Sequence, residues 1–213
     1  MSRGEDNTVK LNVRKTTLGC AGLALALSLT ACGGSGDSSE SQNAGDAPQA
    51  QEAQQAKKGS MQDVMLDQVS LEVPEGWVKS PAEDFDGDWT EGYDDSADAP
   101  TIRVRVAPEI SDSPHPDVVE AELAARAQVG GFYGDEWKGG KREKADIDGA
   151  SRGFKADFTY VAGDGSPMRG RWILMTDPET NKVVTIEIAG EQETLSEDLM
   201  EKIADSIELK PGK

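Results

Sequence analysis

The feature that most limits what this chain can fold into is a long stretch with almost nothing to bury. Residues 33–60 contain no valine, isoleucine, leucine, methionine or aromatic residue and consist mainly of glycine, serine, glutamine, alanine and scattered charges. Such a stretch cannot offset the entropy cost of ordering, so we expect it to be disordered. As a flexible coil, its 28 residues would reach about 30 Å. The folded part of the protein should therefore begin near Met61.

The segment before this stretch has the pattern of a bacterial export signal. Two arginines and two lysines precede an apolar region at residues 16–31, as in a secretory leader. As a helix, these 16 residues would span about 24 Å, which is shorter than the roughly 30 Å hydrocarbon core of a bilayer. A cleaved signal peptide at residues 1–31 is therefore favoured over a membrane-spanning helix.

The apolar region closes on Leu29-Thr30-Ala31-Cys32, which resembles the lipobox of bacterial lipoproteins. In those proteins a diacylglyceryl group is attached to the cysteine sulfur, and the chain is cleaved just before the cysteine. The resemblance implies that Cys32 is the lipidation site and that residues 32–60 form a tether at the extracytoplasmic face of the cell membrane. Two alternatives stay open, namely an ordinary cleaved signal peptide and an uncleaved anchor.

Charge and cysteine content limit what the remaining chain can do. The whole chain carries a net charge of −18, and the leader holds four basic and two acidic residues, so the rest carries −20. This charge repels phosphate backbones and anionic headgroups, which disfavours nucleic-acid binding and electrostatic adhesion to a membrane. Cys20 lies in the leader and Cys32 would carry lipid, so residues 61–213 contain no disulfide. We expect these residues to form one domain that is stabilised by its core alone.

The pattern of apolar residues after Met61 predicts a mainly antiparallel sheet. Alternation of apolar and polar side chains is typical of half-buried strands. Strands are predicted at residues 69–73, 89–93, 102–106, 154–160, 168–176 and 184–188. The second and third of these segments are expected to pair, and two short polar turns join the later segments into a meander.

Two helices are predicted beside these strands. Val119, Leu123 and Ala127 recur at intervals of four residues and so share one helical face. Thr194 and Glu197 fit a capping box at the start of a second, amphipathic helix. The expected fold class is therefore α+β, with a mainly antiparallel sheet of about six or seven strands and two main helices.

The order of these elements resembles the actinobacterial LpqN/LpqT-type lipoproteins. The resemblance rests on the strand end Val73-Pro74-Glu75-Gly76-Trp77, on the meander and on a closing helix that ends at residues 203–207. It covers residues 61–209 together with the lipobox and implies the α/β/α sandwich of PsbP-like proteins. It also implies a cell-envelope protein that acts by binding, and it offers no catalytic residues to carry over.

An acidic loop invites comparison with a calcium site. Asp84, Asp86 and Asp88 alternate as the first ligands of an EF-hand do. However, the position that needs glycine is Trp89, and the position that needs a bidentate glutamate is Asp95. We therefore expect a solvated acidic loop and no metal.

Motifs for other chemistry are incomplete. His115 is the only histidine, whereas a zinc site needs three or four imidazole, thiolate or carboxylate ligands. Ser166 follows a glycine in a predicted turn but lacks the Gly-x-Ser-x-Gly elbow of serine hydrolases. Paired acidic residues are too common in this chain to identify a glycosidase. The sequence therefore predicts no catalytic residue, no metal and no cofactor.

Four arginines stand out against the acidic background. Arg103 and Arg105 share one face of a predicted strand, and Arg169 and Arg171 share one face of another. If the two strands are close, the four guanidinium groups would form a positive patch suited to carboxylate or phosphate ligands. The alternative is that each arginine pairs with a carboxylate across the sheet.

Together these features predict a lipid-anchored lipoprotein that acts as a non-catalytic binding or accessory module of the cell envelope. Its partner would be an envelope protein or lipid that the sequence does not identify. One alternative is an envelope lipid carrier, which would need a long apolar cavity. Another is a cell-wall hydrolase, which would need a cleft with converging carboxylates of raised pKa.

Overall fold

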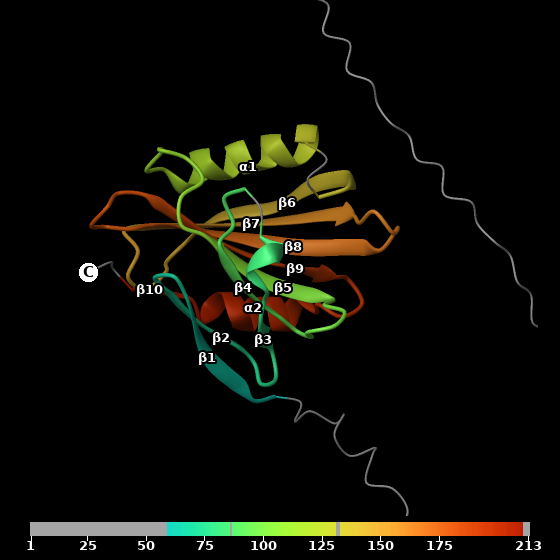
Figure 1. Cartoon of the computed structure of the whole chain (residues 1–213). Coiled ribbons are helices and arrows are strands. Elements are labelled where there is room, and N and C mark those ends of the chain that lie inside the picture. The colour runs from blue at the N-terminus through green and yellow to red at the C-terminus, as the bar shows by residue number, and fades with distance from the viewer. Residues whose placement is uncertain (1–58, 86, 131–132, 211–213) are drawn as a thin grey trace, which may run out of the picture. The chain divides into compact units, whose positions relative to one another are not determined.

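A computed structural model of the 213-residue chain describes residues 59–85, 87–130 and 133–210 (Figure 1). These residues belong to one compact unit, Pro48–Lys213. The predicted leader, Cys32 and nearly all of the predicted tether lie outside the described residues. Within the described part, neither helix has the length and apolar character needed to cross a bilayer.

A seven-stranded antiparallel sheet forms the middle layer of the described chain. Its strands are β3 (Val78–Lys79), β4 (Glu91–Asp94), β5 (Ile102–Ala107), β6 (Asp135–Ala145), β7 (Arg152–Val161), β8 (Pro167–Thr176) and β9 (Val183–Glu191). The strand order is β3-β4-β5-β9-β8-β7-β6. The predicted pairing of β4 with β5 and the predicted meander, which runs through β7, β8 and β9, are both confirmed.

A smaller sheet lies beside the large one in the fold. Its strands are β1 (Met61–Leu66), β2 (Val69–Pro74) and β10 (Glu208–Leu209), in the order β1-β2-β10. Strand β2 pairs antiparallel with both neighbours, so it brings the first and last parts of the domain together. Of these three strands, the alternation of apolar residues predicts only β2.

Two α-helices complete the described part of the fold, together with a short 3-10 turn at Ala82–Asp84. Helix α1 (Pro116–Gly130) packs against one face of the seven-stranded sheet. Helix α2 (Glu197–Asp205) packs on the other face, where the three-stranded sheet also lies (Figure 1). The prediction of an α+β fold with a mainly antiparallel sheet, two helices and α/β/α layers is therefore confirmed.

The predicted capping box of the second helix is wrong. Helix α2 begins at Glu197, and its N-cap is Ser196, whose hydroxyl accepts a hydrogen bond from Leu199 N at 3.2 Å. The Thr194 hydroxyl instead donates to a backbone carbonyl of the preceding turn. The reason is that Leu195 is fully buried, which keeps it and Thr194 in a turn ahead of the helix.

Each face of the seven-stranded sheet carries its own hydrophobic core. The core on the α2 side includes Leu71, Val104, Ile186 and Ile203. The core on the α1 side includes Val119, Leu123, Phe158, Trp172 and Leu174. Trp77, Trp89 and Trp172 are buried in these cores, and Trp137 stacks on Trp172.

Candidate functional site

One part of the sheet face on the α1 side is not covered by α1. The helix packs over β6, β7 and β8, where the sheet presents apolar residues such as Phe158 and Leu174. Beside it, β5 and β9 present Arg103, Arg105 and Glu187 on the same face, because their apolar residues point to the opposite core. The polar side chains lie where the helix cover ends.

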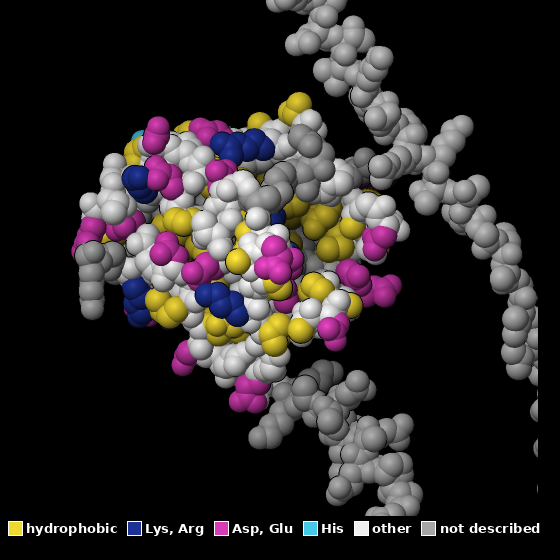
Figure 2. All heavy atoms as spheres, viewed as in Figure 1, with side chains coloured by type: hydrophobic (Ala, Val, Ile, Leu, Met, Phe, Trp, Pro, Cys, Tyr) yellow, Lys and Arg dark blue, Asp and Glu magenta, His cyan; other side chains and the backbone are white. Residues whose placement is uncertain are grey.

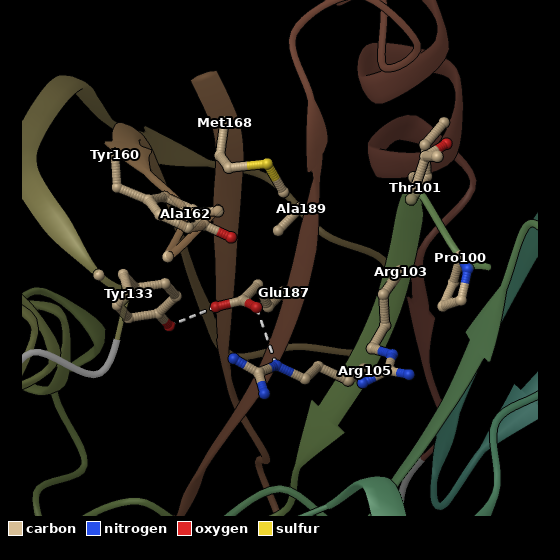
Figure 3. A pocket seen from close by; sticks show the side chains of 13 residues that line it. Pro100, Thr101, Arg103, Arg105, Tyr133, Tyr160, Ala162, Met168, Glu187 and Ala189 are labelled. Carbon is tan, nitrogen blue, oxygen red and sulfur yellow. Dashed lines mark hydrogen bonds and ion pairs between the residues drawn. The ribbon is translucent and has the colours of Figure 1, made fainter. Parts of the chain in front are cut away.

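This region forms an open pocket with a volume of about 610 Å³ (Figure 3). Its lining includes Arg103, Arg105, Tyr133, Tyr160, Met168 and Glu187. The residues come from β5, β7, β8 and β9 and from the segment just before β6. The pocket therefore combines charged groups from central strands with aromatic and thioether groups from strands nearer the edge.

The floor of the pocket is a buried ion pair. Arg105 Nε donates to Glu187 Oε1 at 2.8 Å, and the two side chains are only 13% and 4% exposed. The other carboxylate oxygen accepts from Trp172 Nε1 at 2.9 Å and from the Tyr133 hydroxyl. Three side chains thus satisfy the Glu187 carboxylate, which a buried charge requires.

The guanidinium group of Arg105 also contacts an aromatic ring. Its guanidinium lies 4.3 Å from the centre of the buried Trp89 ring, within the range of a cation–π contact. Burial acts to lower the pKa of Arg105, but the charge and hydrogen bond of Glu187, with a contribution from Tyr133, raise it above the ordinary value. Arg105 therefore stays charged inside the protein.

Two tyrosines form one wall of the pocket. The rings of Tyr133 and Tyr160 meet edge to face, with centroids 5.3 Å apart. Burial, followed by the negative charge of Glu187, raises the pKa of Tyr160 to about 12. The same causes raise the pKa of Tyr133 well above its ordinary value. At both hydroxyls the charge of Glu187 acts more strongly than that of Arg105, and both phenols are neutral at physiological pH.

Gly134 allows Tyr133 to reach the pocket. Its φ is +80°, a backbone conformation that residues with a side chain rarely adopt. A Cβ at this position would lie 2.3 Å from the Val161 carbonyl oxygen. Close backbone approach between the start of β6 and the end of β7 thus depends on glycine, and it positions Tyr133 beside Glu187.

The four arginines predicted as a binding patch lie on opposite faces of the sheet. Trp172 points to the α1 side, so its neighbour Arg171 must point to the α2 side, as does Arg169. Arg103 and Arg105 point to the α1 side and line the pocket. The four guanidinium groups therefore do not form one patch, and a binding role for Arg103 and Arg105 stays a prediction.

All four arginines have carboxylate partners, and for Arg103, Arg105 and Arg171 one partner lies directly opposite on a neighbouring strand, as the alternative interpretation of the sequence expects. On the α2 side, Arg171 pairs with Asp157 at 2.6 Å, with Glu197 at 2.8 Å and with Glu201. Arg169 lies 3.8 Å from Glu197. These pairs connect β8 to its neighbour and to α2.

Apart from Arg103 and Arg105, sequence reasoning missed the main side chains of the pocket. Glu187 lies between Ile186 and Ile188 in the strand with the clearest apolar alternation, and a carboxylate inside such a strand was an available signal. Tyr133 and Tyr160 had no comparable signal, because their place in the pocket depends on how β6 and β7 pair.

The other candidate chemistries gain no geometric support from the described residues. In the acidic loop, Asp84 pairs with Arg103 and Asp88 pairs with Arg126, while Asp86 lies outside the described residues. Within the described ranges there is no group of three or more histidine, cysteine, aspartate or glutamate side chains that could hold a metal. The backbone N–H of Ser166 donates to Asp164 in the β7–β8 turn, which agrees with its interpretation as a turn serine.

Comparison with known proteins gives fold similarity alone. No protein-family model matches the chain, and no match is found among curated proteins. Among solved structures, it is similar to the Ran-binding protein Mog1p of Saccharomyces cerevisiae, with 12% identity, 71% of this chain and 96% of that chain covered, and a TM-score of 0.48.

A second similar structure is LpqN of Mycobacterium tuberculosis, described as involved in cell envelope biogenesis. It is 13% identical, with 73% of this chain and 95% of that chain covered, and a TM-score of 0.45. LpqN bears the name of the lipoprotein type that the sequence resembles. Similarity this distant carries no conclusion about activity or partners.

Proposed function

We propose that this protein is a non-catalytic binding module of the cell envelope, anchored through lipid on Cys32, that binds its ligand in the pocket beside Glu187. The observation that supports this proposal is the buried Arg105–Glu187 pair at the floor of an open pocket. A buried ion pair adds little stability compared with apolar residues of similar volume. Its presence at the floor of a pocket is therefore better explained by recognition than by stability.

The composition of the pocket favours binding over hydrolysis. Among the described lining residues, Glu187 carries the only carboxylate. A glycoside hydrolase needs two carboxylates on either side of the bond that it cleaves. Both oxygens of the Glu187 carboxylate are also already engaged by three side-chain donors.

The same floor disfavours the lipid-carrier alternative at this pocket. An alkyl chain placed against Arg105 and Glu187 would cover charged groups and offer them no hydrogen bonds in return. A ligand with at least one polar group fits the pocket better.

The anchoring part of the proposal is tested by replacing the cysteine. Cells that express the Cys32→Ala variant are labelled with a palmitate analogue and fractionated, with Cys20→Ala as the matched control. We expect label and membrane retention to be lost for Cys32→Ala and kept for Cys20→Ala, because two acyl chains give stable anchoring. Equal labelling of Cys32→Ala and the parent would refute lipidation at this position.

The binding part is tested by filling the pocket from its rim. Ala162 lines the pocket and is partly exposed, so Ala162→Trp should obstruct it without disturbing the core. Ala125→Trp, on the exposed side of α1, is the matched control. Parent and variants are captured from crosslinked envelopes, and the proteins and lipids recovered are identified by mass spectrometry.

We expect partners that are recovered with the parent and Ala125→Trp but lost with Ala162→Trp. Recovery of the same set with all three chains would place the binding site outside this pocket.

A further inference from the structure

The charged side chains around the pocket do not favour an anionic ligand. Arg103 makes two hydrogen bonds to the buried Asp94, at 2.6 Å and 3.0 Å, and a third to Asp84 at 2.8 Å. Arg105 is matched by Glu187. Two guanidinium groups thus face three carboxylates, in a chain of net charge −18. An anionic ligand would meet no excess of positive charge here.

The charges are also unevenly placed within the pocket. Glu187 lies between Arg105 on one side and the wall of Tyr160 and Met168 on the other (Figure 3). The Arg105 guanidinium is drawn toward Trp89, which belongs to the loop that precedes β4. At the Tyr160 hydroxyl the negative charge of Glu187 outweighs the positive charge of Arg105. The aromatic side of the pocket is therefore the negative side.

Aromatic rings next to a carboxylate are a favourable environment for a cation. The ring face carries negative charge density, and the attraction is stronger where water is largely excluded. Because burial lowers the effective dielectric constant around Glu187, its charge acts on a nearby group without direct contact. Met168 and Ala189 add apolar surface, which suits the carbon stem of a lysine, an arginine or an organic amine.

We propose that the pocket binds an organic cation, an alkylammonium or guanidinium group on an apolar stem, between the Tyr160 and Met168 wall and Glu187. This inference rests on the proposed function, since it names the class of ligand taken by the same pocket. It replaces the expectation of an anionic ligand that the four arginines suggest in the sequence.

The test uses small probes and one resonance of the full chain. The indole N–H of Trp172 donates to Glu187 at 2.9 Å, so its NMR resonance reports on the floor of the pocket. The probes are capped lysine, arginine, norleucine and glutamate, each with an acetyl group and a methylamide, and free benzylamine. We expect the lysine and arginine probes to shift the resonance saturably, with a Kd at least about tenfold below that of the norleucine probe.

A change of salt concentration and two variants of Tyr160 identify the cause of the preference for the lysine probe over the norleucine probe. The lysine preference should shrink at high salt, because part of the attraction is electrostatic. Tyr160→Leu should bring the lysine and norleucine probes to similar affinity, whereas Tyr160→Phe, which keeps the ring, should preserve the difference. Arg169→Gln, on the opposite face of the sheet, is the control and should change nothing.

The same titrations distinguish two possible sources of the cation, a side chain of a partner protein and a free amine. Tighter binding of the capped lysine or arginine probes than of benzylamine points to a side chain of a partner protein. Tighter binding of benzylamine points to a free amine. Both results support the inference.

Three results would overturn it. Tighter binding of the glutamate probe would show an anion site, equal binding of norleucine and lysine would show apolar contact alone, and no shift with any probe would show that cations are not bound. The proposed function fails separately, when Ala162→Trp leaves the captured envelope partners unchanged.

Discussion

Glu187 and Arg105 show what a buried charge does at the scale of single residues. Every residue of β9 except the last is buried, and Glu187 is charged among apolar neighbours. Its oxygens are satisfied by side chains from β5, β8 and the segment before β6. Removing one member of such a network leaves another buried polar group without its partner.

We therefore predict a strong and reversible effect at this pair. Arg105→Met leaves Glu187 without its counter-ion and should lower the free energy of unfolding by about 3–5 kcal/mol. Adding Glu187→Leu should restore most of the stability, because two apolar residues replace the pair. Urea unfolding measures both changes.

The exposed pair Lys79–Glu91 provides the matched control. Lys79→Met should cost less than about 1 kcal/mol, because exposed ion pairs contribute little. A double variant at positions 105 and 187 that is as unstable as Arg105→Met would contradict the explanation and make the pair a structural requirement.

The candidate site could be predicted only in part from residue patterns. Alternation along β5 correctly placed Arg103 and Arg105 on one face, because that period is a local property of a strand. It did not give the partner of Arg105, since Glu187 is distant in sequence and becomes its neighbour only when β5 pairs with β9. Long-range pairing, rather than local pattern, makes the pocket.

Among the elements, helix α2 is attached to the sheet by charge as well as by its apolar face. Its buried residues Met200, Ile203 and Ala204 pack against the sheet. On its flank, Glu197 and Glu201 pair with Arg171 of β8. The helix is short, so its first turn and its ion pairs should matter for its stability.

The N-cap of α2 gives a prediction with an internal control. Ser196→Ala removes the acceptor for Leu199 N and should lower the free energy of unfolding by about 1 kcal/mol. Thr194→Ala, two residues earlier and outside the helix, should cost clearly less. Chemical unfolding of the two variants decides between Ser196 and the capping box expected from sequence, which requires the opposite order.

The ion pairs of α2 predict how stability depends on pH. The hydrogen bond from Arg171 lowers the pKa of Glu201 below its ordinary value of 4.5. The folded state therefore binds this proton less readily than the unfolded state, and the stabilisation is present above pH 4.5 and lost as pH falls below it.

We expect Glu201→Gln to flatten the fall in stability below pH 4.5, relative to the parent. Thermal unfolding between neutral pH and about pH 3 measures this difference. Asp198→Asn, on the same helix, serves as a control for the general effect of removing a negative charge. An equal flattening by both variants would contradict a specific role for Glu201.

Which elements could be predicted depends on where they lie in the sheet. Central strands such as β9 show regular apolar alternation because one or both of their faces are buried. Strand β6 is an edge strand with two register irregularities and several lysines, so its sequence shows no regular apolar alternation. Charged and irregular edge strands resist unwanted pairing with other sheets. The same charges and irregularities interrupt the apolar alternation by which a strand is recognised in a sequence.

At the scale of the molecule, two cores share one sheet. Residues 61–213 contain no cysteine, and the cores on both faces meet at β8 and β9. We expect residues 61–213, produced alone, to unfold in a single cooperative transition that is unchanged by reductant or EDTA. Calorimetry with each additive is the measurement, and a fall of more than a few degrees in Tm with EDTA would contradict it.

The layered fold was accessible from sequence because it follows from the order and type of the long elements. The open pocket could not be predicted from the sequence, because it depends on which strands α1 covers. That coverage is set by side-chain packing of residues such as Leu123 against β7 and β8, and the order of elements does not express it.

The position of β1 has a mechanical consequence. Within the described chain, β1 pairs with β2 alone, and its first residue, Met61, lies opposite Pro74 at the end of β2. A force applied from the N-terminal side would load that end first and break the hydrogen bonds pair by pair, as a zipper opens. The seven-stranded sheet does not include β1. Tension would therefore separate β1 from the small sheet before the force acted on the strands that form the pocket.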